Sequence, residues 1–425
     1  MKQAALLSLV FGAIVSIARP DEVTDWNKTL FQAALVAKTS PVAITRTAAI
    51  FESSVFDAVN GIDRRFTPIH VQEAGPRRAC KRAAAVQAAY ASLIRLYPDQ
   101  KTTFDQKRAE SLECLSGHRH RDAFAILAGL EWGQKVADEI WNWRSTDGSS
   151  PAPPPFEGGT AIGEWRPTPP AFLPGALPQF ATMETWVIQS HSQFRPVQGP
   201  PSLDSAQYAQ DFNEVKDMGS VSSPTRSADE TLAAQFWATS TTNYFWNSVA
   251  LSLLDRHLHS LLENARLLAL LNIAIADAGI VCWDAKYYFV SWRPVTAIPL
   301  ADQDGNPATQ PDTNWTPLIV TPPFPEYPSG HSTASSAAAA VLAEYFGEHV
   351  HFTVNSDVMT GVIRRFTSFS AALDEIRSAR VNGGIHYRTA CNDGQSLGEE
   401  VARYVMGHSF HRLRGPRDDD EDDER

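Results

Sequence analysis

Apolar residues recur every three or four positions along most of this chain, which is the spacing of one buried face of an α-helix. In the first part of the chain the pattern predicts helices over residues 45–62, 78–97 and 119–144. The same periodicity resumes near residue 227 and continues to about residue 284. Strand-like alternation of apolar and polar residues is scarce. The pattern therefore predicts an all-α fold, in which helical bundles are joined by long irregular loops.

Proline interrupts the helical pattern in two places. Residues 149–202 are rich in proline, which disfavours regular helix, and residues 294–328 form a second irregular stretch. Helices are predicted again over residues 330–346, 368–382 and 393–408. The predicted parts of the chain are a signal peptide (1–18), an N-terminal helical region (19–148), an irregular crossing (149–226), a C-terminal helical bundle (227–412) and an acidic disordered tail (413–425).

The N-terminus has the features of an export signal. Lys2 precedes an apolar run over residues 4–18, and Ser16-Ile17-Ala18 places small residues where a signal peptidase cuts. A membrane anchor is the alternative, but the run is shorter than the roughly 20 residues that span a bilayer. We identify no later segment that is long and apolar enough to span. The expectation is a secreted or periplasmic protein with no stable membrane span.

Composition and charge narrow the class of protein. Hydrophobic residues make up 43% of the chain and charged residues 20%, as in folded soluble proteins. The formal charge is -11, but the last eight residues hold seven acids and one arginine, so the rest carries only about -5. The sequence has no basic stripe with interleaved aromatic residues, which argues against a nucleic acid partner.

Four cysteines form an even set in a chain expected to reach an oxidising compartment. Two disulfides are therefore possible, with three connectivities. Proximity in sequence favours Cys80 with Cys114, which leaves Cys282 with Cys391. Reduced thiols in the core are the alternative. None of the four has the short paired spacing of a zinc site.

The candidate chemistry lies in three short patterns in the C-terminal half. Each is weak alone, and their joint occurrence in this order is the strong signal. The patterns are Lys286 with Arg293-Pro294, then Pro328-Ser329-Gly330-His331, then Arg380 with His386.

The second pattern marks the start of a helix. Unpaired backbone amides and the helix dipole bind oxyanions at such a position. The missing side chain of Gly330 lets an anion approach the backbone, and Ser329 adds a hydroxyl donor. A plain helix start would explain Pro328 and Ser329 but gives no reason for His331.

Three cations come from separate segments and together match the charge of a trivalent oxyanion such as phosphate or vanadate. Arg293 and Arg380 each offer two parallel donors, which lysine does not. Lys286 sits in an aromatic run, where a buried charge needs a partner. His331, at the positive end of a helix, suits a neutral acid/base, and His386, after two glycines, suits an apical ligand or nucleophile.

At these residues the sequence resembles the superfamily that joins vanadium-dependent haloperoxidases to type 2 phosphatidic acid phosphatases and bacterial acid phosphatases. The three patterns match its signature blocks. The haloperoxidase branch is the more similar. This rests on Pro322-Pro323-Phe324-Pro325-Glu326-Tyr327 and Trp283-Asp284-Ala285-Lys286, with weaker likeness at Val23-Thr24-Asp25-Trp26-Asn27 and Phe56-Asp57-Ala58-Val59-Asn60.

The resemblance implies roles for the matching residues, at the loop end of the C-terminal bundle. His386 would bond the metal directly, and His331 would be the acid/base that helps hydrogen peroxide bind. Phe324 and Trp283 would line the place where halide meets the activated peroxide. The residues that would hold the oxygens of bound vanadate are Lys286, Arg293, Ser329, Gly330 and Arg380.

The implied function is a vanadate-dependent haloperoxidase that oxidises halide with hydrogen peroxide to hypohalous acid, with a small organic acceptor as a possible further partner. No haem or nicotinamide is implied. Two positions depart from the family pattern, Ala379 where many members have serine and Ala390 where many have aspartate. A carboxylate at 390 would orient His386. Asp393 is a candidate replacement, although a helix N-cap is its more ordinary role.

Two other functions stay open at this point. One is a phosphatase of the same fold, in which His386 attacks phosphorus and His331 protonates the leaving group, with phosphate as the bound group. The other is a secreted anion-binding protein with a degenerate site, suggested by Ala390 and the acidic tail.

Overall fold

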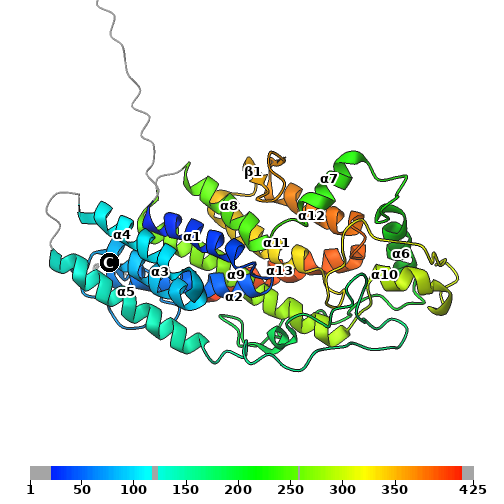
Figure 1. Ribbon diagram of the computed structural model, residues 1–425, viewed down its shortest axis with the longest axis horizontal. Helices are drawn as coiled ribbons and strands as arrows, with labels where there is room; N and C mark the ends of the chain where they lie inside the picture. The colour runs from blue at the N-terminus through cyan, green and yellow to red at the C-terminus, as the bar shows by residue number, and fades with distance from the viewer. Residues whose placement is uncertain (1–20, 117–122, 257–258, 414–425) are drawn as a thin grey trace, which may run out of the picture.

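The computed structural model describes residues 21–116, 123–256 and 259–413. It is mostly helical, and a single pair of short strands forms the sheet present in the described residues, so the all-α prediction is confirmed. Figure 1 shows an elongated molecule with α1–α5 at one end and α6, α7, α10 and α12 at the other. The predicted signal peptide, and the predicted acidic tail apart from Leu413, lie outside the described residues.

The described residues of the N-terminal half form five α-helices. The predictions at 45–62, 78–97 and 119–144 correspond to α2, α3 and α5, and the first residues of the last prediction lie outside the described part. The helices are α1 (Glu22–Val36), α2 (Ala43–Asp63), α3 (Lys81–Leu96), α4 (Lys101–Ser116) and α5 (Ala123–Arg144), with the 3-10 helix η1 at Pro98–Gln100.

Periodicity alone did not identify α1 and α4. In α1, Asp21 caps the helix by accepting a hydrogen bond from the backbone N–H of Thr24 (2.9 Å). In α4 only Phe104 and Leu115 are buried, so the apolar repeat is too sparse to detect.

The proline-rich crossing is irregular as predicted up to about residue 205, apart from the 3-10 helix η2 (Pro178–Thr182). Its predicted continuation to residue 226 is wrong, because α6 (Ala206–Met218) lies there. Ser205 caps α6, and Tyr208, Phe212 and Val215 form its buried face at intervals of four and three. These residues join Trp292 in a small second hydrophobic cluster.

In the described residues, the region of helical periodicity that begins near residue 227 is divided into three helices. They are α7 (Ala228–Phe236), α8 (Thr242–Leu254) and α9 (Leu261–Phe289). Ser227 with Glu230, and Ser260 with Glu263, form capping boxes that start α7 and α9. Short polar segments between the helices break a continuous apolar pattern.

The long helix α9 is the central element of the fold. It packs against α2, α11 and α13, and most of its residues are buried. By length and composition it is apolar enough to cross a membrane, so the expectation that no later segment is so apolar was wrong. However, 89% of its most apolar window is buried inside the protein. The apolarity of α9 is that of a core helix.

The rest of the chain builds the end of the bundle that carries the predicted motifs. The elements are α10 (Pro294–Ala297), η3 (Ile298–Gln303), α11 (Gly330–Phe346), β1 (Phe352–Asn355), β2 (Ile363–Phe366), α12 (Phe369–Asn382) and α13 (Arg388–His408). The two strands pair antiparallel, with Phe352 opposite Phe366. The start of α11 at Gly330 and the position of α12 agree with the predictions, whereas α13 begins five residues before the predicted residue 393.

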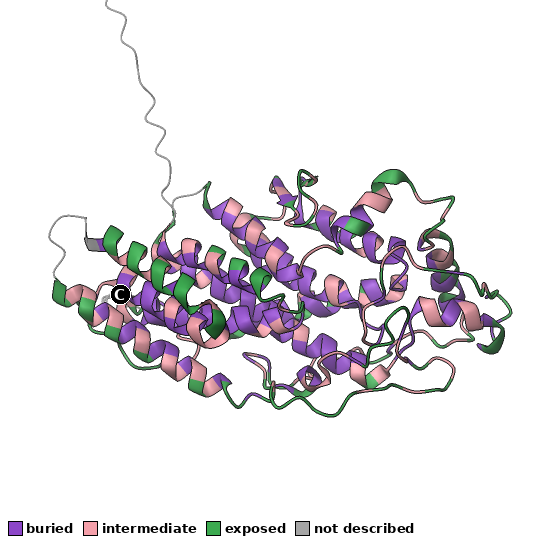
Figure 2. Ribbon diagram, viewed as in Figure 1, coloured by how far each residue is buried: buried purple, intermediate pink, exposed green. Residues whose placement is uncertain are grey.

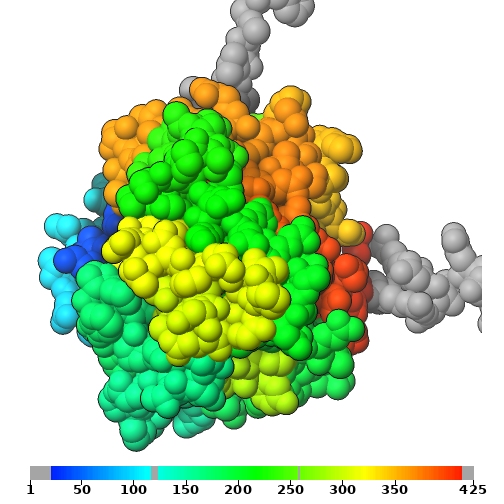
Figure 3. Space-filling model, turned by 90° about the vertical axis from the view of Figure 1, so that its right-hand side faces the viewer, coloured from blue at the N-terminus to red at the C-terminus, as the bar shows by residue number. Residues whose placement is uncertain are grey.

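The two helical halves share one hydrophobic core. A continuous cluster of buried residues runs from Trp26 on α1 through α2 and α9 to Val401 on α13. Figure 2 shows the buried residues in the middle of the bundle and exposed faces on α4 and α5. At the opposite end, Figure 3 shows the surface formed by the crossing, the region of α6 and α7, and the stretch after α10.

The cysteines of the core are thiols. Cys282 on α9 and Cys391 on α13 are both buried and are not joined to each other, so the expected disulfide between them is not formed. Burial raises the pKa of both thiols. A link between Cys80 and Cys114 stays a prediction.

Candidate active site

Lys286 lies in the last turn of α9 and is fully buried. Its ammonium donates hydrogen bonds to the backbone carbonyls of Pro325 (2.9 Å), Glu326 (2.9 Å) and Pro328 (2.5 Å). Burial lowers the pKa of Lys286 to about 8. These contacts fix the lysine against the loop that leads into α11.

Arg293 follows α9 directly in sequence and is also fully buried. Its Nε donates to the carbonyl of Phe324 (3.0 Å) and its Nη1 donates to the carbonyl of Ile385 (2.6 Å). The same Nη1 lies 3.2 Å from Nε2 of His386. Arg293 therefore joins the loop before α11 to the loop before α13.

The N-terminus of α11 forms the floor of the site. Ser329 is the N-cap residue, and its buried hydroxyl accepts from the backbone N–H of Ser332 at 3.5 Å. A Cβ added to Gly330 would meet Trp283, Cys282 and Lys286 at 3.6 to 4.0 Å, which is ordinary contact. Protein packing thus does not require glycine here. The missing side chain leaves room beside Lys286, as an approaching anion needs.

His331 and Arg380 meet at one backbone carbonyl. Nε2 of His331 lies 3.0 Å from the oxygen of Trp237, and Nη1 of Arg380 donates to the same oxygen at a long 3.5 Å. A carbonyl only accepts, so Nε2 of His331 carries a proton and Nδ1 is left as the basic atom. The pKa of His331 lies well below its usual value, first because of burial and then because of Arg380.

His386 is oriented by a carboxylate that sequence analysis did not identify. Nδ1 of His386 donates to Oε1 of Glu326 (2.8 Å), which also accepts the backbone N–H of Tyr387 (3.0 Å). Nε2 of His386 then keeps its lone pair and faces Arg293. Burial, followed by the charge of Arg293, lowers the pKa of His386 well below its usual value. Burial raises the pKa of Glu326 to about 7.

The suggested substitute for the missing carboxylate at Ala390 is wrong. Asp393 neither caps α13 nor contacts His386 in the structure, because the helix begins at Arg388 and Tyr387 is its N-cap residue. Its carboxylate accepts a hydrogen bond from the hydroxyl of Tyr327 (2.6 Å) instead.

The buried cations have hydrogen-bonding capacity left over. Burial lowers the pKa of Arg293 and of Arg380 to about 10. Within the described residues, Nη2 of Arg293 and Nε of Arg380 are buried and have no hydrogen-bond partner. Unsatisfied buried donors on charged groups are costly, so an anion at this place would supply what the protein does not. The donor set fits a tetrahedral oxyanion bound between the guanidinium groups and Nε2 of His386.

A cavity of about 590 Å³ opens on the site. Gly330, His331, Arg380 and His386 line one part of it, and a largely apolar set lines the rest. The rings of Trp283 and Phe324 lie 5.0 Å apart, centroid to centroid, and both line the cavity. Phe324 also covers Lys286 and Arg293 at 5.2 and 5.0 Å from its ring centre.

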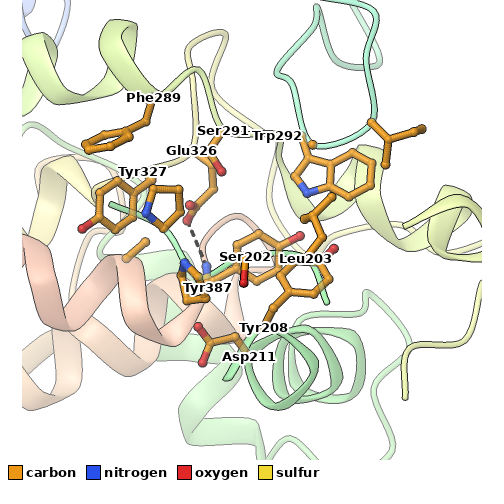
Figure 4. A pocket seen from close by; sticks show the side chains of 15 residues that line it. Ser202, Leu203, Tyr208, Asp211, Phe289, Ser291, Trp292, Glu326, Tyr327 and Tyr387 are labelled. Carbon is orange, nitrogen blue, oxygen red and sulfur yellow. Dashed lines mark hydrogen bonds between the residues drawn. The ribbon is translucent and has the colours of Figure 1, made fainter. Parts of the chain in front are cut away.

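Glu326 lines a second, smaller cavity. The second cavity measures about 260 Å³ and is lined by Glu326, Tyr387, Tyr208 and Asp211, among others. Figure 4 shows these side chains, with the hydrogen bond that the backbone N–H of Tyr387 donates to Glu326 drawn as a dashed line. One carboxylate thus contacts His386 and also lines the second cavity.

All the residues predicted for the site lie in one region of the structure. Residues near His331 and His386 include Lys286, Arg293 and Arg380, whose charges act on the pKa of both histidines. Sequence reasoning missed Glu326 and the carbonyl of Trp237. Glu326 stands inside the quoted stretch before Pro328, and a carboxylate in a run of prolines and aromatics is a signal that was available. A backbone carbonyl leaves no signal in the sequence.

Parts of the chain are similar to known proteins. A family model described as the VCPO second helical-bundle domain matches residues 266–415. Vanadium chloroperoxidase of Curvularia inaequalis is 37% identical over 95 residues, which are 20% of this chain. The matched segment spans only 15% of that relative.

Solved structures extend the likeness to nearly the whole chain. The structure described as the first bacterial vanadium-dependent iodoperoxidase has a TM-score of 0.78 and 26% identity, covering 93% of this chain and 98% of that one. A holo-type bacterial vanadium-dependent chloroperoxidase has a TM-score of 0.70 and 18% identity, covering 93% and 99%, and it supports the fold alone. The chain is therefore similar to vanadium haloperoxidases, by the family model over residues 266–415, by the curated relative over 95 residues and by the solved structures over most of its length.

Proposed function

We propose that this protein is a vanadate-dependent haloperoxidase, which oxidises halide with hydrogen peroxide to hypohalous acid. The observation that carries the proposal is the set of buried cations with unpartnered donors around Nε2 of His386. The similarity to vanadium haloperoxidases supports the choice of this chemistry for such a site.

The residues that would hold vanadate divide into two kinds. His386 would bond the metal through Nε2, the ring nitrogen that carries no proton because Nδ1 donates to Glu326, and the metal would take the place of the Nη1 donor of Arg293 there. The oxygens would be held by Arg293, Ser329, Gly330 and Arg380, while Lys286, whose three N–H donors are taken by backbone carbonyls, would contribute its charge. When bound, vanadate supplies a Lewis acid that polarises a peroxide oxygen toward attack by halide.

His331 would move the protons. Its Nε2–H is held by the carbonyl of Trp237, and its lowered pKa keeps the imidazole neutral near pH 7. A neutral imidazole with basic Nδ1 accepts a proton from hydrogen peroxide as it binds and returns the proton when hypohalous acid leaves. Trp283 and Phe324 would exclude bulk water from this place.

The direct test is peroxide-dependent oxidation of iodide, bromide and chloride, with and without added vanadate. We expect turnover only with vanadate, and inorganic phosphate should compete with it. His331→Ala should abolish turnover but keep much of the vanadate affinity, measured by equilibrium dialysis, whereas His386→Ala should weaken binding itself. Absence of halide oxidation with vanadate bound would refute the proposal, and equal loss of binding in both variants would refute the assigned roles.

A phosphatase of the same fold is the second candidate, and the hydrogen bond from His386 to Glu326 favours it. An imidazole oriented by a carboxylate presents Nε2 as a nucleophile. The test is hydrolysis of p-nitrophenyl phosphate, with acid-quench trapping of phosphohistidine. Hydrolysis that vanadate inhibits, together with no halide oxidation, would select this activity over the first.

A further inference from the structure

The carbonyl oxygen that holds His331 comes from the end of a short helix. Trp237 is the C-cap residue of α7, and a carbonyl at a helix C-terminus has no partner within its own helix. Here it accepts Nε2–H of His331 at 3.0 Å and a long hydrogen bond from Nη1 of Arg380 at 3.5 Å. The orientation of the His331 ring therefore depends on where the end of α7 is held.

The indole of Trp237 is bonded to α12, the helix that carries Arg380. Its Nε1 donates to Oε1 of Glu375 at 2.9 Å, and the residue is only 2% exposed. Helix α7 packs against α12, and Figure 1 shows the two helices at the same end of the molecule. Trp237 thus contacts α12 twice, through its side chain at Glu375 and through its carbonyl at Arg380. Two attachments to one helix leave the carbonyl little freedom to turn.

Glu375 is itself held by an ion pair. Arg364 on β2 donates to both of its oxygens, from Nε to Oε1 at 3.0 Å and from Nη2 to Oε2 at 2.5 Å. The same guanidinium donates to both oxygens of Asp229, in the first turn of α7, at 2.6 and 3.1 Å. Paired hydrogen bonds of this kind fix the geometry of both partners. Arg364 therefore fastens the start of α7 through Asp229 and its end through Glu375.

We propose that Glu375 is a positioning residue for His331. By holding the indole of Trp237, it keeps the carbonyl of that residue where it accepts Nε2–H of His331, so that Nδ1 stays the basic atom. Glu375 acts through Trp237 and not on the reacting atoms. The consequence for turnover rests on the proposed function, because His331 is the residue that moves protons there.

The acceptor matters because a neutral imidazole has two forms. Its proton can be carried by either ring nitrogen, and the hydrogen bond that one nitrogen makes decides which. Without a fixed acceptor, the ring of His331 can turn and its proton can exchange with water. The base is then in place for only part of the time.

The direct test is nitrogen-15 NMR of histidine-labelled protein, without vanadate, halide or peroxide, with the His331 signals assigned from His331→Gln. Wild type should carry the proton on Nε2 and exchange it slowly with water. Trp237→Phe removes the indole N–H but keeps a ring beside Phe245, whose centroid is 5.0 Å from that of Trp237. This variant and Glu375→Leu should each exchange the proton about 10-fold faster, as expected for one lost hydrogen bond.

Three further variants separate positioning from a general loosening of α7. Glu375→Gln keeps an acceptor for the indole, so the His331 signals should stay those of wild type. Asp229→Asn weakens the bond of Arg364 to the other end of α7, so it should lower the melting temperature without changing those signals. Trp237→Phe combined with Glu375→Leu should have no larger effect than either change alone, because both remove the same bond.

Turnover measures what the positioning does for the reaction. In Glu375→Leu and Trp237→Phe, kcat/KM for hydrogen peroxide should fall about 10-fold, since part of the general base catalysis by His331 is lost. KM for iodide should stay the same, because neither change alters the place where halide reacts. Glu375→Gln and Asp229→Asn should oxidise iodide as wild type does.

The inference and the proposed function can fail separately. Unchanged proton exchange in both Trp237→Phe and Glu375→Leu overturns the role of Glu375, and so does an equally fast exchange in Asp229→Asn. Failure of wild type to oxidise any halide overturns the proposed function, and the NMR test still judges the role of Glu375. If Glu375→Leu does not fold, Trp237→Phe against Asp229→Asn decides the question.

Discussion

Buried charges occur at two places in the C-terminal half of the molecule, at the middle of α9 and at the site, and the protein satisfies them differently. Asp277 accepts hydrogen bonds from the backbone N–H groups of Trp186, Val187 and Ile188 at 2.7 to 3.1 Å, and it thereby holds the crossing against α9. At the site, the buried guanidinium groups of Arg293 and Arg380 keep donors without partners in the described residues.

Burial of charge therefore does not by itself identify a functional site. Both kinds of group have pKa values shifted by burial, that of Asp277 to about 6 and that of Arg380 to about 10. The difference lies in the hydrogen-bonding capacity that remains. A fully bonded charge such as Asp277 has a structural task, whereas a charge with unpaired donors is prepared for a ligand.

The largest effect is expected on stability, from a substitution of Asp277, the fully bonded buried charge. Asp277→Ala leaves three backbone N–H groups without their acceptor, so the free energy of unfolding should fall by roughly 3–5 kcal/mol. Urea denaturation measures this loss. Asp277→Asn, which keeps one acceptor, should lose less, and vanadate affinity of the folded protein should change less than about twofold. A variant as stable as wild type would show that the carboxylate does not anchor the crossing.

The sequence was sufficient to predict those parts of the site that are residue types at fixed spacing. Lys286, Arg293, Ser329, Gly330, His331, Arg380 and His386 all lie within the three motifs. The partner of His386 was not predictable in this way, because Glu326 is 60 residues distant and only tertiary packing brings the two together.

The same limit applies to the fold. Helices with a dense apolar face, such as α2 and α9, follow from periodicity. Helix α4 buries too few residues for an apolar periodicity to be recognised. Helix α6 lies in the segment that was predicted to be irregular because of its prolines.

A substitution of Arg380 at the site should have the opposite effect, which is to weaken vanadate binding and leave stability unchanged. Arg380→Ala should weaken vanadate binding at least 100-fold, about 3 kcal/mol, because two charge-assisted donors are lost. The anion-free protein should be no less stable than wild type, since the change removes a desolvated and incompletely paired cation. Equilibrium dialysis and thermal denaturation measure the two quantities.

Arg388→Ala is the matched control for Arg380. Arg388 is bonded to Glu214 on α6 and lies outside the site, so its loss should leave vanadate affinity unchanged. If Arg380→Ala were strongly destabilised without anion, Arg380 would belong with the structural charges instead.

The pH dependence of stability that Glu52 causes is a further test of how the protein treats buried charges. One of its oxygens accepts from Nδ2 of Asn27 (2.6 Å), the other has no partner in the described structure, and burial raises its pKa to about 8. The Glu52 carboxyl therefore keeps its proton in the folded protein, whereas the unfolded chain loses that proton above the reference pKa of 4.5. Because of this difference, the contribution of Glu52 to wild-type stability falls as pH rises from about 4.5 to about 8.

Glutamine at position 52 does not ionise, so Glu52→Gln should remove this part of the pH dependence. Relative to wild type, the variant should gain roughly 2 kcal/mol between pH 4.5 and pH 6, measured by urea denaturation at both values. Vanadate affinity should stay the same. A constant difference between the two proteins across this range would show that Glu52 is not protonated in the folded state.

The smallest effect is expected for Glu326, a buried acid that has both a structural hydrogen bond and a contact with the site. Its Oε1 accepts from the backbone of Tyr387, as a structural carboxylate does, and also from Nδ1 of His386, which orients a ligand-binding atom. Glu326→Gln keeps an acceptor of the same shape, so the fold should persist, but the loss of charge makes Nε2 of His386 less basic. Vanadate affinity should fall about 10-fold, whereas Asp393→Asn, which alters a carboxylate bonded to Tyr327 instead, should leave it unchanged. Equal affinity in Glu326→Gln and wild type would place Glu326 with the purely structural acids.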